Sequence, residues 1–350
     1  MSDPTPPASS TYELYPPSNI EVSERPVVRQ RYWLHALLLV STFFTMLVVG
    51  ARMYDNFVHG LATFPGGDLA LYEYIAKLYH NPSELLNGMF FAVPLVLILL
   101  CHEMGHYLYC VHYGVDATLP FFIPFTAPIG TLGAFIRIRS GIHSRAALFD
   151  IGIAGPIAGF VASCIVLAFA LPFSRPLAPG PVDIYIGTPL IFNIVNGILG
   201  GLGVGASAKL GLEQVALHPA AVAAWVGMFA TFMNLLPGGQ LDGGHIVYSL
   251  VPRAHRWITR LSVAALVLMI WSWWGWILWA VMLYFSGHRH PQVAPWPDLS
   301  GRRRLVSLVA LVLLVLTFVP QPFRRGNSDM PPMGAGEYVR EFISHLERAK

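Results

Sequence analysis

Residues 91–110 read FAVPLVLILLCHEMGHYLYC, and this stretch decides the class of protein. Between Met89 and Val111 the only side chain with a full charge at neutral pH is Glu103, which stands between two histidines. The remaining residues form an apolar run long enough for a membrane-spanning helix, which needs about 20 residues. A charge near the centre of a bilayer costs about 2.5–3.5 kcal/mol on insertion scales, so polar groups kept there are functional candidates.

The whole chain is as apolar as this stretch. Of its 350 residues, 55% are hydrophobic and 12% are charged, and the mean hydropathy is +0.55. Soluble domains carry about 25% charged residues, so we interpret the chain as an all-α polytopic membrane protein that has the lipid bilayer as a partner. A net charge of +3 with no basic helix or nucleic-acid motif excludes nucleic acid as a partner.

Apolar runs predict about six to eight membrane segments. The candidate spans are residues 33–51, 89–111, 148–172, 216–240, 261–285 and 305–320. Residues 186–208 are apolar but glycine-rich, and we interpret them as a re-entrant or interfacial segment. The sequence leaves open whether 261–285 is one span or a hairpin broken near Trp274 and Gly275.

The arginines of the loops set the predicted orientation. They gather before the first span, between the second and third, and after the fourth. By the positive-inside rule, the N-terminus lies inside, and the second and fourth spans run from outside to inside. This inner-side polarity points to a multi-pass protein of the prokaryotic plasma (inner) membrane with a cytoplasmic N-terminus. A plastid protein would need a transit peptide, and the acidic residues Asp3, Glu13 and Glu21 in the tail argue against one. The side of the C-terminus stays open.

HEMGH at 102–106 fits the pattern H-E-x-x-H. On a helix, residues four apart share a face, so His102 and His106 can bind one metal ion. Neutral imidazoles suit Zn²⁺. Glu103 follows the first histidine by about 100° around the helix, where it can reach metal-bound water without ligating the metal. It is therefore the candidate general base.

Asp242 is the candidate third ligand, since a zinc site needs more than two protein ligands. It is the first charged residue after an apolar span that runs in the same direction as the HEMGH helix. Pro237 and the two glycines after it would end that helix and let the backbone bend toward the metal. Asn234 lies two turns earlier and can hydrogen bond to a substrate backbone or an oxyanion. Of two interpretations of His245, a partner that supports a metal ligand or a loop histidine, we favour the loop histidine.

Two other patterns predict how the core is assembled. Residues 134–140, AFIRIRS, alternate apolar and polar side chains after three prolines, which predicts a strand in a small membrane-associated β-hairpin. Gly155 and Gly159 form a small-xxx-small pattern, with Gly152 one turn earlier. Such residues let helices approach closely, so this span is expected to pack between the two ligand-bearing helices.

Together these residues resemble the site-2 protease family of intramembrane zinc metalloproteases. HEMGH at 102–106 matches the family's H-E-x-G-H helix, and NLLPGGQLDGG at 234–244 matches its N-x-x-P-x-x-x-x-D-G segment. The resemblance covers residues 89–250 and implies a three-helix metalloprotease core. It also implies roles for five residues, with zinc held by His102, His106 and Asp242, Glu103 as general base, and Asn234 contacting the peptide.

The resemblance also implies the reaction and the partners. Family members hydrolyse transmembrane segments of other proteins near the cytosolic side of the membrane. The loop at 173–215 is too short for an inserted PDZ domain of about 80–100 residues, so the chain resembles the subgroup without one. A non-proteolytic scaffold, or a metal or proton transporter, is the alternative. The sequence does not predict the substrate or the oligomeric state.

These interpretations divide the chain into five parts. They are a disordered cytoplasmic tail (1–31), the first transmembrane anchor with an extracytosolic loop (32–88), the intramembrane metalloprotease core (89–250), C-terminal transmembrane segments (251–325) and a polar tail (326–350).

Overall fold

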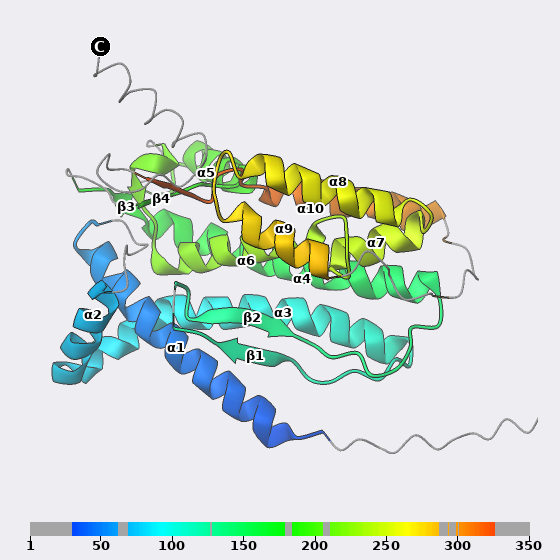
Figure 1. Ribbon diagram of the computed structural model, residues 1–350. Coiled ribbons are helices and arrows are strands. Elements are labelled where there is room, and N and C mark those ends of the chain that lie inside the picture. The colour runs from blue at the N-terminus through cyan, green and yellow to red at the C-terminus, as the bar shows by residue number, and fades with distance from the viewer. Residues whose placement is uncertain are drawn as a thin grey trace, which may run out of the picture. The chain divides into compact units, whose positions relative to one another are not determined.

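The apolar stretch that contains HEMGH is a single helix in the computed structural model, α3 (Met89–His112). Two further helices, α4 (Arg145–Ala170) and α6 (Pro219–Leu235), pack along it and along each other (Figure 1). A Cβ added at Gly227 of α6 would stand 2.5 Å from both Ile98 of α3 and Ser163 of α4. The three helices therefore meet along one line, which is the frame of the site described below.

The structure describes residues 30–61, 69–126, 128–178, 184–205, 211–286, 293, 299 and 301–325. The chain divides into Met1–Arg31 and Tyr32–Lys350, and the described helices and strands all belong to the second unit. The predicted tail at 1–31 lies outside the described residues except for its last two positions, and the predicted tail at 326–350 lies wholly outside them.

Most of the other elements are also helices. The other helices are α1 (Tyr32–Val58), α2 (Leu69–His80), η1 (Pro82–Gly88), η2 (Leu171–Phe173), α5 (Leu190–Gly201), η4 (Leu212–Gln214), α7 (Asp242–Leu250), α8 (His255–Met269), α9 (Trp276–Phe285) and α10 (Gly301–Thr317). The strands are β1 (Phe121–Pro124), β2 (Thr131–Phe135), β3 (Arg175–Pro176), β4 (Ile184–Ile186), β5 (Val215–Ala216) and β6 (Phe323–Arg325).

Three described helical segments are long and apolar enough to cross a membrane. They are Tyr32–Val58, Pro82–His112 and Arg145–Phe173, and the shorter apolar helices are α5, α6 and α9. The chain is thus mostly helical with several membrane-type helices, while the count of six to eight segments stays a prediction. Residues 186–208 contain α5, whose 12 residues extend about 18 Å, which is less than a bilayer core.

The stretch 261–285 is two helices that pack against each other, α8 and α9. The chain turns at Ile270–Gly275, where Trp271, Ser272 and Trp276 donate hydrogen bonds to carbonyls three residues earlier. Of the two arrangements that the sequence leaves open, the structure has the broken one. A buried Trp276 side chain and a hydrogen bond from its Nε1 to Pro320 O hold the second helix of this pair in place.

A small antiparallel pair, β1–β2, lies beside α1 and α3 (Figure 1). The strand predicted at 134–140 begins earlier, at Thr131, and ends at Phe135. Beyond Phe135, Ile138 forms only an isolated bridge with Ala117. Most of the residues whose polarity alternates in the sequence therefore lie after the end of the strand. α1 supports the pair, since Thr45 Oγ1 donates a hydrogen bond of 2.6 Å to Gly130 O. Association of this pair with a membrane stays a prediction.

Candidate metal centre

His102, Glu103 and His106 lie on one stretch of α3 and are all buried, with exposed fractions of 6%, 7% and 7%. The two histidines are one helical turn apart, and their ring centroids are 4.9 Å apart. Leu99, one turn before His102, is also buried. An α-helix in an apolar run thus presents two imidazoles to the interior of the protein, as expected for residues four apart.

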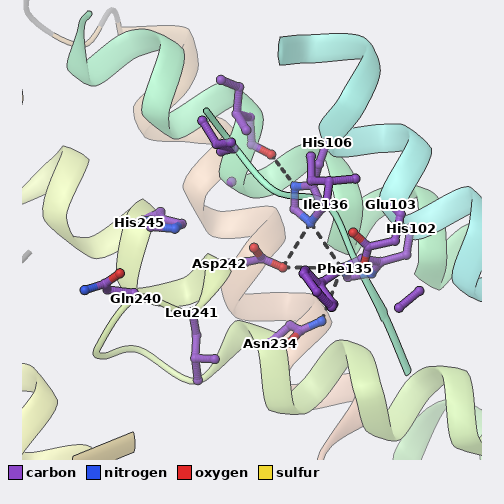
Figure 2. Close-up of a pocket in the computed structure, with 14 residues that line it drawn as sticks. His102, Glu103, His106, Phe135, Ile136, Asn234, Gln240, Leu241, Asp242 and His245 are labelled. Carbon is purple, nitrogen blue, oxygen red and sulfur yellow. Dashed lines mark hydrogen bonds and ion pairs between the residues drawn. The ribbon is translucent and has the colours of Figure 1, made fainter. Parts of the chain in front are cut away.

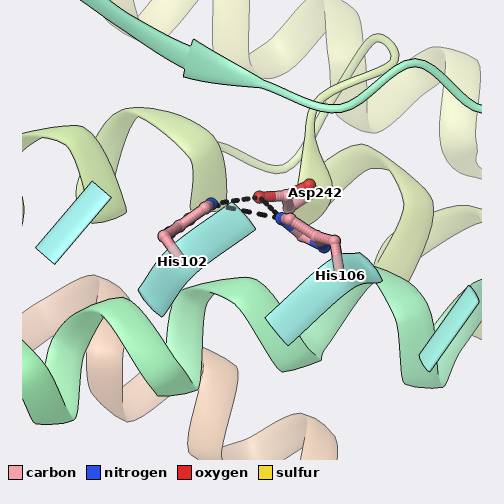
Figure 3. A group of neighbouring side chains, drawn as sticks. All are labelled: His102, His106 and Asp242. Carbon is pink, nitrogen blue, oxygen red and sulfur yellow. Dashed lines mark hydrogen bonds and ion pairs between the residues drawn. The ribbon is translucent and has the colours of Figure 1, made fainter. Parts of the chain in front are cut away.

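Asp242 approaches these histidines from the first residue of α7 (Figure 3). Its Oδ2 lies 3.3 Å from Nε2 of His102 and 3.3 Å from Nε2 of His106. The two Nε2 atoms are 3.2 Å apart. Residues separated by 136 positions in the sequence therefore place three potential ligand atoms at the corners of a nearly equilateral triangle.

The triangle has the dimensions of a zinc site. With zinc–ligand bonds of about 2.0–2.1 Å, the ligand atoms of a tetrahedral site stand about 3.3–3.4 Å apart. The distances between the three atoms here are 3.2 and 3.3 Å. Two imidazoles and one carboxylate also form the type of ligand set that catalytic zinc sites use, with a fourth position left for water. The residues present fit a zinc ion.

The backbone fixes which nitrogen of His106 faces the triangle. Nδ1 of His106 lies 2.7 Å from the carbonyl oxygen of Ile151 in α4. A carbonyl can only accept a hydrogen bond, so Nδ1 carries the proton and the neutral ring has its lone pair on Nε2. That lone pair faces the Asp242 carboxylate, so two hydrogen-bond acceptors lie side by side without a proton between them. A cation bound between the two atoms would stabilise this arrangement. Such a carbonyl partner is usual for metal-binding histidines.

The glycines of α4 make room for both rings. A Cβ at Gly155 would overlap the His106 ring, standing 2.5 Å from Cδ2 and from Cε1. At Gly159 it would stand 2.9 Å from Nδ1 of His102. At Gly152 it would stand 3.2 Å from Cβ of His245. The small-residue pattern of α4 therefore does more than bring helices together, because it forms the wall against which the imidazoles are packed.

Helix α8 holds the turn that leads to Asp242. The backbone N–H of Gly239 donates a hydrogen bond of 3.2 Å to Thr259 Oγ1, and Nε2 of His255 donates to Gly239 O at 3.1 Å. Ser262 donates to Pro237 O at 3.0 Å. His255 is the first residue of α8 and is buried.

The triangle borders a cavity of about 240 Å³ that also contains the other predicted site residues (Figure 2). Glu103 lies beside His102, and its carboxylate accepts a hydrogen bond from the backbone N–H of Ile136. Nδ2 of Asn234 lies 3.2 Å from Nε2 of His102. The structure therefore brings together all five residues singled out from the sequence, although they come from three different helices.

Two lining residues were missed from the sequence. Gln240 borders the cavity from the turn before α7, and no pattern in the sequence marks it. His245 also borders the cavity and lies within α7, not in a loop. His245 lies three residues after Asp242, which places it near the same face of that helix. This spacing is the feature of the sequence that indicates its place at the site.

Comparison with known proteins identifies the family of this chain. Residues 90–278 match the profile of the family described as "Peptidase family M50". The chain belongs to peptidase family M50. The matched part of this M50 chain runs from the start of α3 into α9 and so contains both ligand-bearing helices. The resemblance to the site-2 protease family is confirmed.

Three curated plant proteins are similar to this M50 chain. "Probable zinc metalloprotease EGY2, chloroplastic" of Arabidopsis thaliana is 31% identical over 270 residues, which are 75% of this chain and 47% of the relative. "Probable zinc metalloprotease EGY1, chloroplastic" of Oryza sativa subsp. japonica is 27% identical over 323 residues, which are 86% of this chain and 52% of the relative. The EGY1 protein of Arabidopsis thaliana is 30% identical over 235 residues, which are 64% of this chain and 41% of the relative. The chain spans about half the length of these relatives.

The relatives overturn the predicted location. The sequence predicts a prokaryotic plasma membrane, whereas these relatives are chloroplastic plant proteins. The prediction was wrong because arginines in loops report the side of a bilayer on which a loop lies. They carry no information on which bilayer it is.

Proposed function

We propose that this protein is an intramembrane zinc endopeptidase that hydrolyses peptide bonds in or near the transmembrane segments of other proteins. The observation that carries the proposal is the triangle of His102, His106 and Asp242, with sides of 3.2 and 3.3 Å. Its two histidines lie on a helix apolar enough to span a membrane. A buried carboxylate, Glu103, borders the same cavity. The zinc metalloprotease names of the relatives support the choice of metal and reaction.

His102, His106 and Asp242 would hold the ion. Bound zinc lowers the pKa of its water toward 7 and polarises the scissile carbonyl. Glu103 accepts the proton of the attacking water and passes it to the leaving amine as general base and then acid. The hydrogen bond from Ile136 N–H keeps this carboxylate oriented toward the cavity.

Asn234 is proposed to contact the peptide. Its amide now lies 3.2 Å from Nε2 of His102, the atom whose lone pair an ion would use. Ligation would therefore free the Asn234 amide for a carbonyl or backbone N–H of the substrate in the same cavity. An amide donor beside the scissile bond also stabilises a developing oxyanion.

The strand β2 is proposed to present the substrate. In the described sheet β2 pairs only with β1, which leaves its second edge unpaired. Ala134 and Phe135, at the end of this strand, border the cavity of the site. A peptide added to that edge would be extended, which exposes its backbone to attack, and strand addition to sheet edges is a common mode of peptide recognition.

The proposed setting is a multi-pass membrane protein, and the relatives' names point to a chloroplast membrane. The three long apolar helices and the shorter ones would supply six to eight membrane segments. Within them, residues 89–250 form the protease core, 32–88 the first anchor with its outer loop, and 251–325 the C-terminal segments.

The test is cleavage of a model transmembrane peptide by the full chain in liposomes. The proposal expects cleavage by the wild type, none by Asp242→Asn, and a rate at least about 100-fold lower for Glu103→Gln. Glu73→Gln is the matched control, because Glu73 is exposed on α2 outside the cavity. Cleavage that survives Glu103→Gln would overturn the mechanism. Zinc binding without cleavage would favour the scaffold alternative, and zinc or proton flux across the liposome would favour the transporter.

A further inference from the structure

A second cavity, of about 510 Å³, lies toward the other end of α3 and α4. Cavities of about 300–1,000 Å³ are typical of small-molecule sites. Phe90 and Pro94 of α3 line it together with Phe169 of α4. Phe90 precedes His102 by 12 residues, which at 1.5 Å per residue places the cavity about 18 Å along the helix from the metal centre. In a hydrocarbon core of about 30 Å, this position is close to the opposite membrane surface.

Aromatic side chains form one wall of this cavity. Tyr54 of α1 stacks on Phe90, with ring centroids 5.1 Å apart and an interplanar angle of 13°. The ring of His218 meets Phe57 and Phe90 edge-on, with centroids 5.1 and 5.5 Å away. Tyr and Trp are enriched where membrane proteins cross the headgroup level, so the place of Tyr54 agrees with the depth of the cavity.

The mouth of the cavity faces away from the protein. Ile165, Phe169 and Phe173 border it and are 53%, 75% and 68% exposed. On a helix that crosses a membrane, exposed apolar side chains meet acyl chains. The cavity therefore opens to the lipid and offers a surface to which an acyl chain can bind.

Two hydrogen-bond donors stand at one end of this apolar cavity. The guanidinium of Arg175 lies over the Phe57 ring, with Cζ 5.0 Å from its centroid, and it forms no ion pair with any described side chain. Nδ1 of His218 accepts a hydrogen bond of 3.2 Å from Ala220 N–H, so the neutral ring carries its proton on Nε2. A cation and an N–H donor at one end of an apolar cavity are complementary to an anionic head with an apolar tail.

We propose that this cavity binds an anionic phospholipid, with its phosphate at Arg175 and His218 and an acyl chain between Pro94 of α3 and Ile165 of α4. The proposal goes beyond the peptidase activity and does not rest on it. Charge complementarity and the lipid-facing mouth favour a lipid, because a phospholipid supplies both an anion at the headgroup level and an acyl chain for the apolar part of the cavity.

The experiment is native mass spectrometry of the full chain in detergent, titrated with phosphatidylglycerol or phosphatidylcholine of identical acyl chains. The wild type should prefer phosphatidylglycerol. Arg175→Gln should weaken phosphatidylglycerol binding about tenfold, as expected for loss of a charge-assisted hydrogen bond. It should weaken phosphatidylcholine binding less, because the choline cation of that lipid offsets the charge of its phosphate. The matched control is Arg324→Gln, because Arg324 lies over the Tyr185 ring at 5.5 Å but outside the cavity.

A second pair of variants tests the apolar part of the site. Ile165→Trp should fill the groove and weaken the binding of both lipids, whereas Val161→Trp, one turn earlier on α4 and 50% exposed outside the cavity, should weaken neither. Glu103→Gln should bind lipid as the wild type does, which separates this proposal from the peptidase proposal. Equal affinity for the two lipids, or equal effects of Arg175→Gln and Arg324→Gln, would overturn it. The proposal would also be overturned if Ile165→Trp disrupted a dimer of the chain or displaced a bound transmembrane peptide.

Discussion

A single methyl group at Gly155 is expected to damage the metal centre while leaving the fold nearly intact. In Gly155→Ala the new Cβ would overlap Nε2 of His106 and stand 2.5 Å from two ring carbons. The ring would have to move, because the methyl group is fixed to the backbone of α4. Displacing a metal-binding histidine from its supporting contacts reduces metal affinity about 10–100-fold, so zinc affinity should fall by that factor.

The stability of this variant should change less than its zinc affinity. Overpacking costs about 1–3 kcal/mol, while replacing glycine by alanine inside a helix stabilises it by about 0.8–1.0 kcal/mol. The net loss in the free energy of unfolding is therefore about 0–2 kcal/mol. Gly159→Ala, with the nearest ring atom at 2.9 Å, should show a smaller loss of zinc affinity.

The assay is competition for zinc between the purified full chain and a chromophoric chelator, with chemical unfolding of the same samples. Gly197→Ala is the matched control, because its Cβ meets nothing within 4 Å in the helix α5. It should bind zinc as the wild type does. Wild-type zinc affinity in Gly155→Ala would refute the argument that α4 forms the wall against the imidazoles.

Three further outcomes follow from the same contacts. Glu103→Gln should bind zinc as the wild type does while its cleavage rate falls at least about 100-fold, measured by equilibrium dialysis and peptide cleavage. Thr259→Val leaves the buried N–H of Gly239 without its acceptor and should cost about 1–3 kcal/mol of unfolding free energy and lower zinc affinity; unchanged values for both would contradict the role of α8. Arg303→Gln removes hydrogen bonds of 2.7–3.1 Å to Asp150. Because the pair is partly exposed, the expected loss in urea unfolding is about 1 kcal/mol.

The sequence could predict the ligands because each stands out against its surroundings. His102, Glu103 and His106 follow a helical spacing inside an apolar run, and Asp242 is the first charge after another such run. The structure brings these residues together, as their shared direction in the two helices required. The supporting contact from Thr259 was not predictable, since it joins a turn to a helix 20 residues later through one hydroxyl.

The strand was misplaced for a related reason. Arg137 and Arg139 gave the clearest alternation, yet the paired residues are Thr131–Phe135. The register of that strand is set by partners outside it, including the hydrogen bond from Thr131 Oγ1 to Ile123 O. Gly133, with φ of 103°, takes a backbone conformation that residues with side chains rarely adopt. A local pattern of polarity does not contain this information.

The central claim is that His102, His106 and Asp242 together bind zinc, and X-ray absorption at the zinc edge of the purified full chain tests it most directly. We expect one zinc per chain with nitrogen and oxygen neighbours at about 2.0–2.2 Å and the multiple-scattering signal of two imidazoles. The signal should be lost in Asp242→Asn and His106→Ala. A shell of sulfur neighbours at about 2.3 Å, or zinc that persists unchanged in both variants, would contradict it.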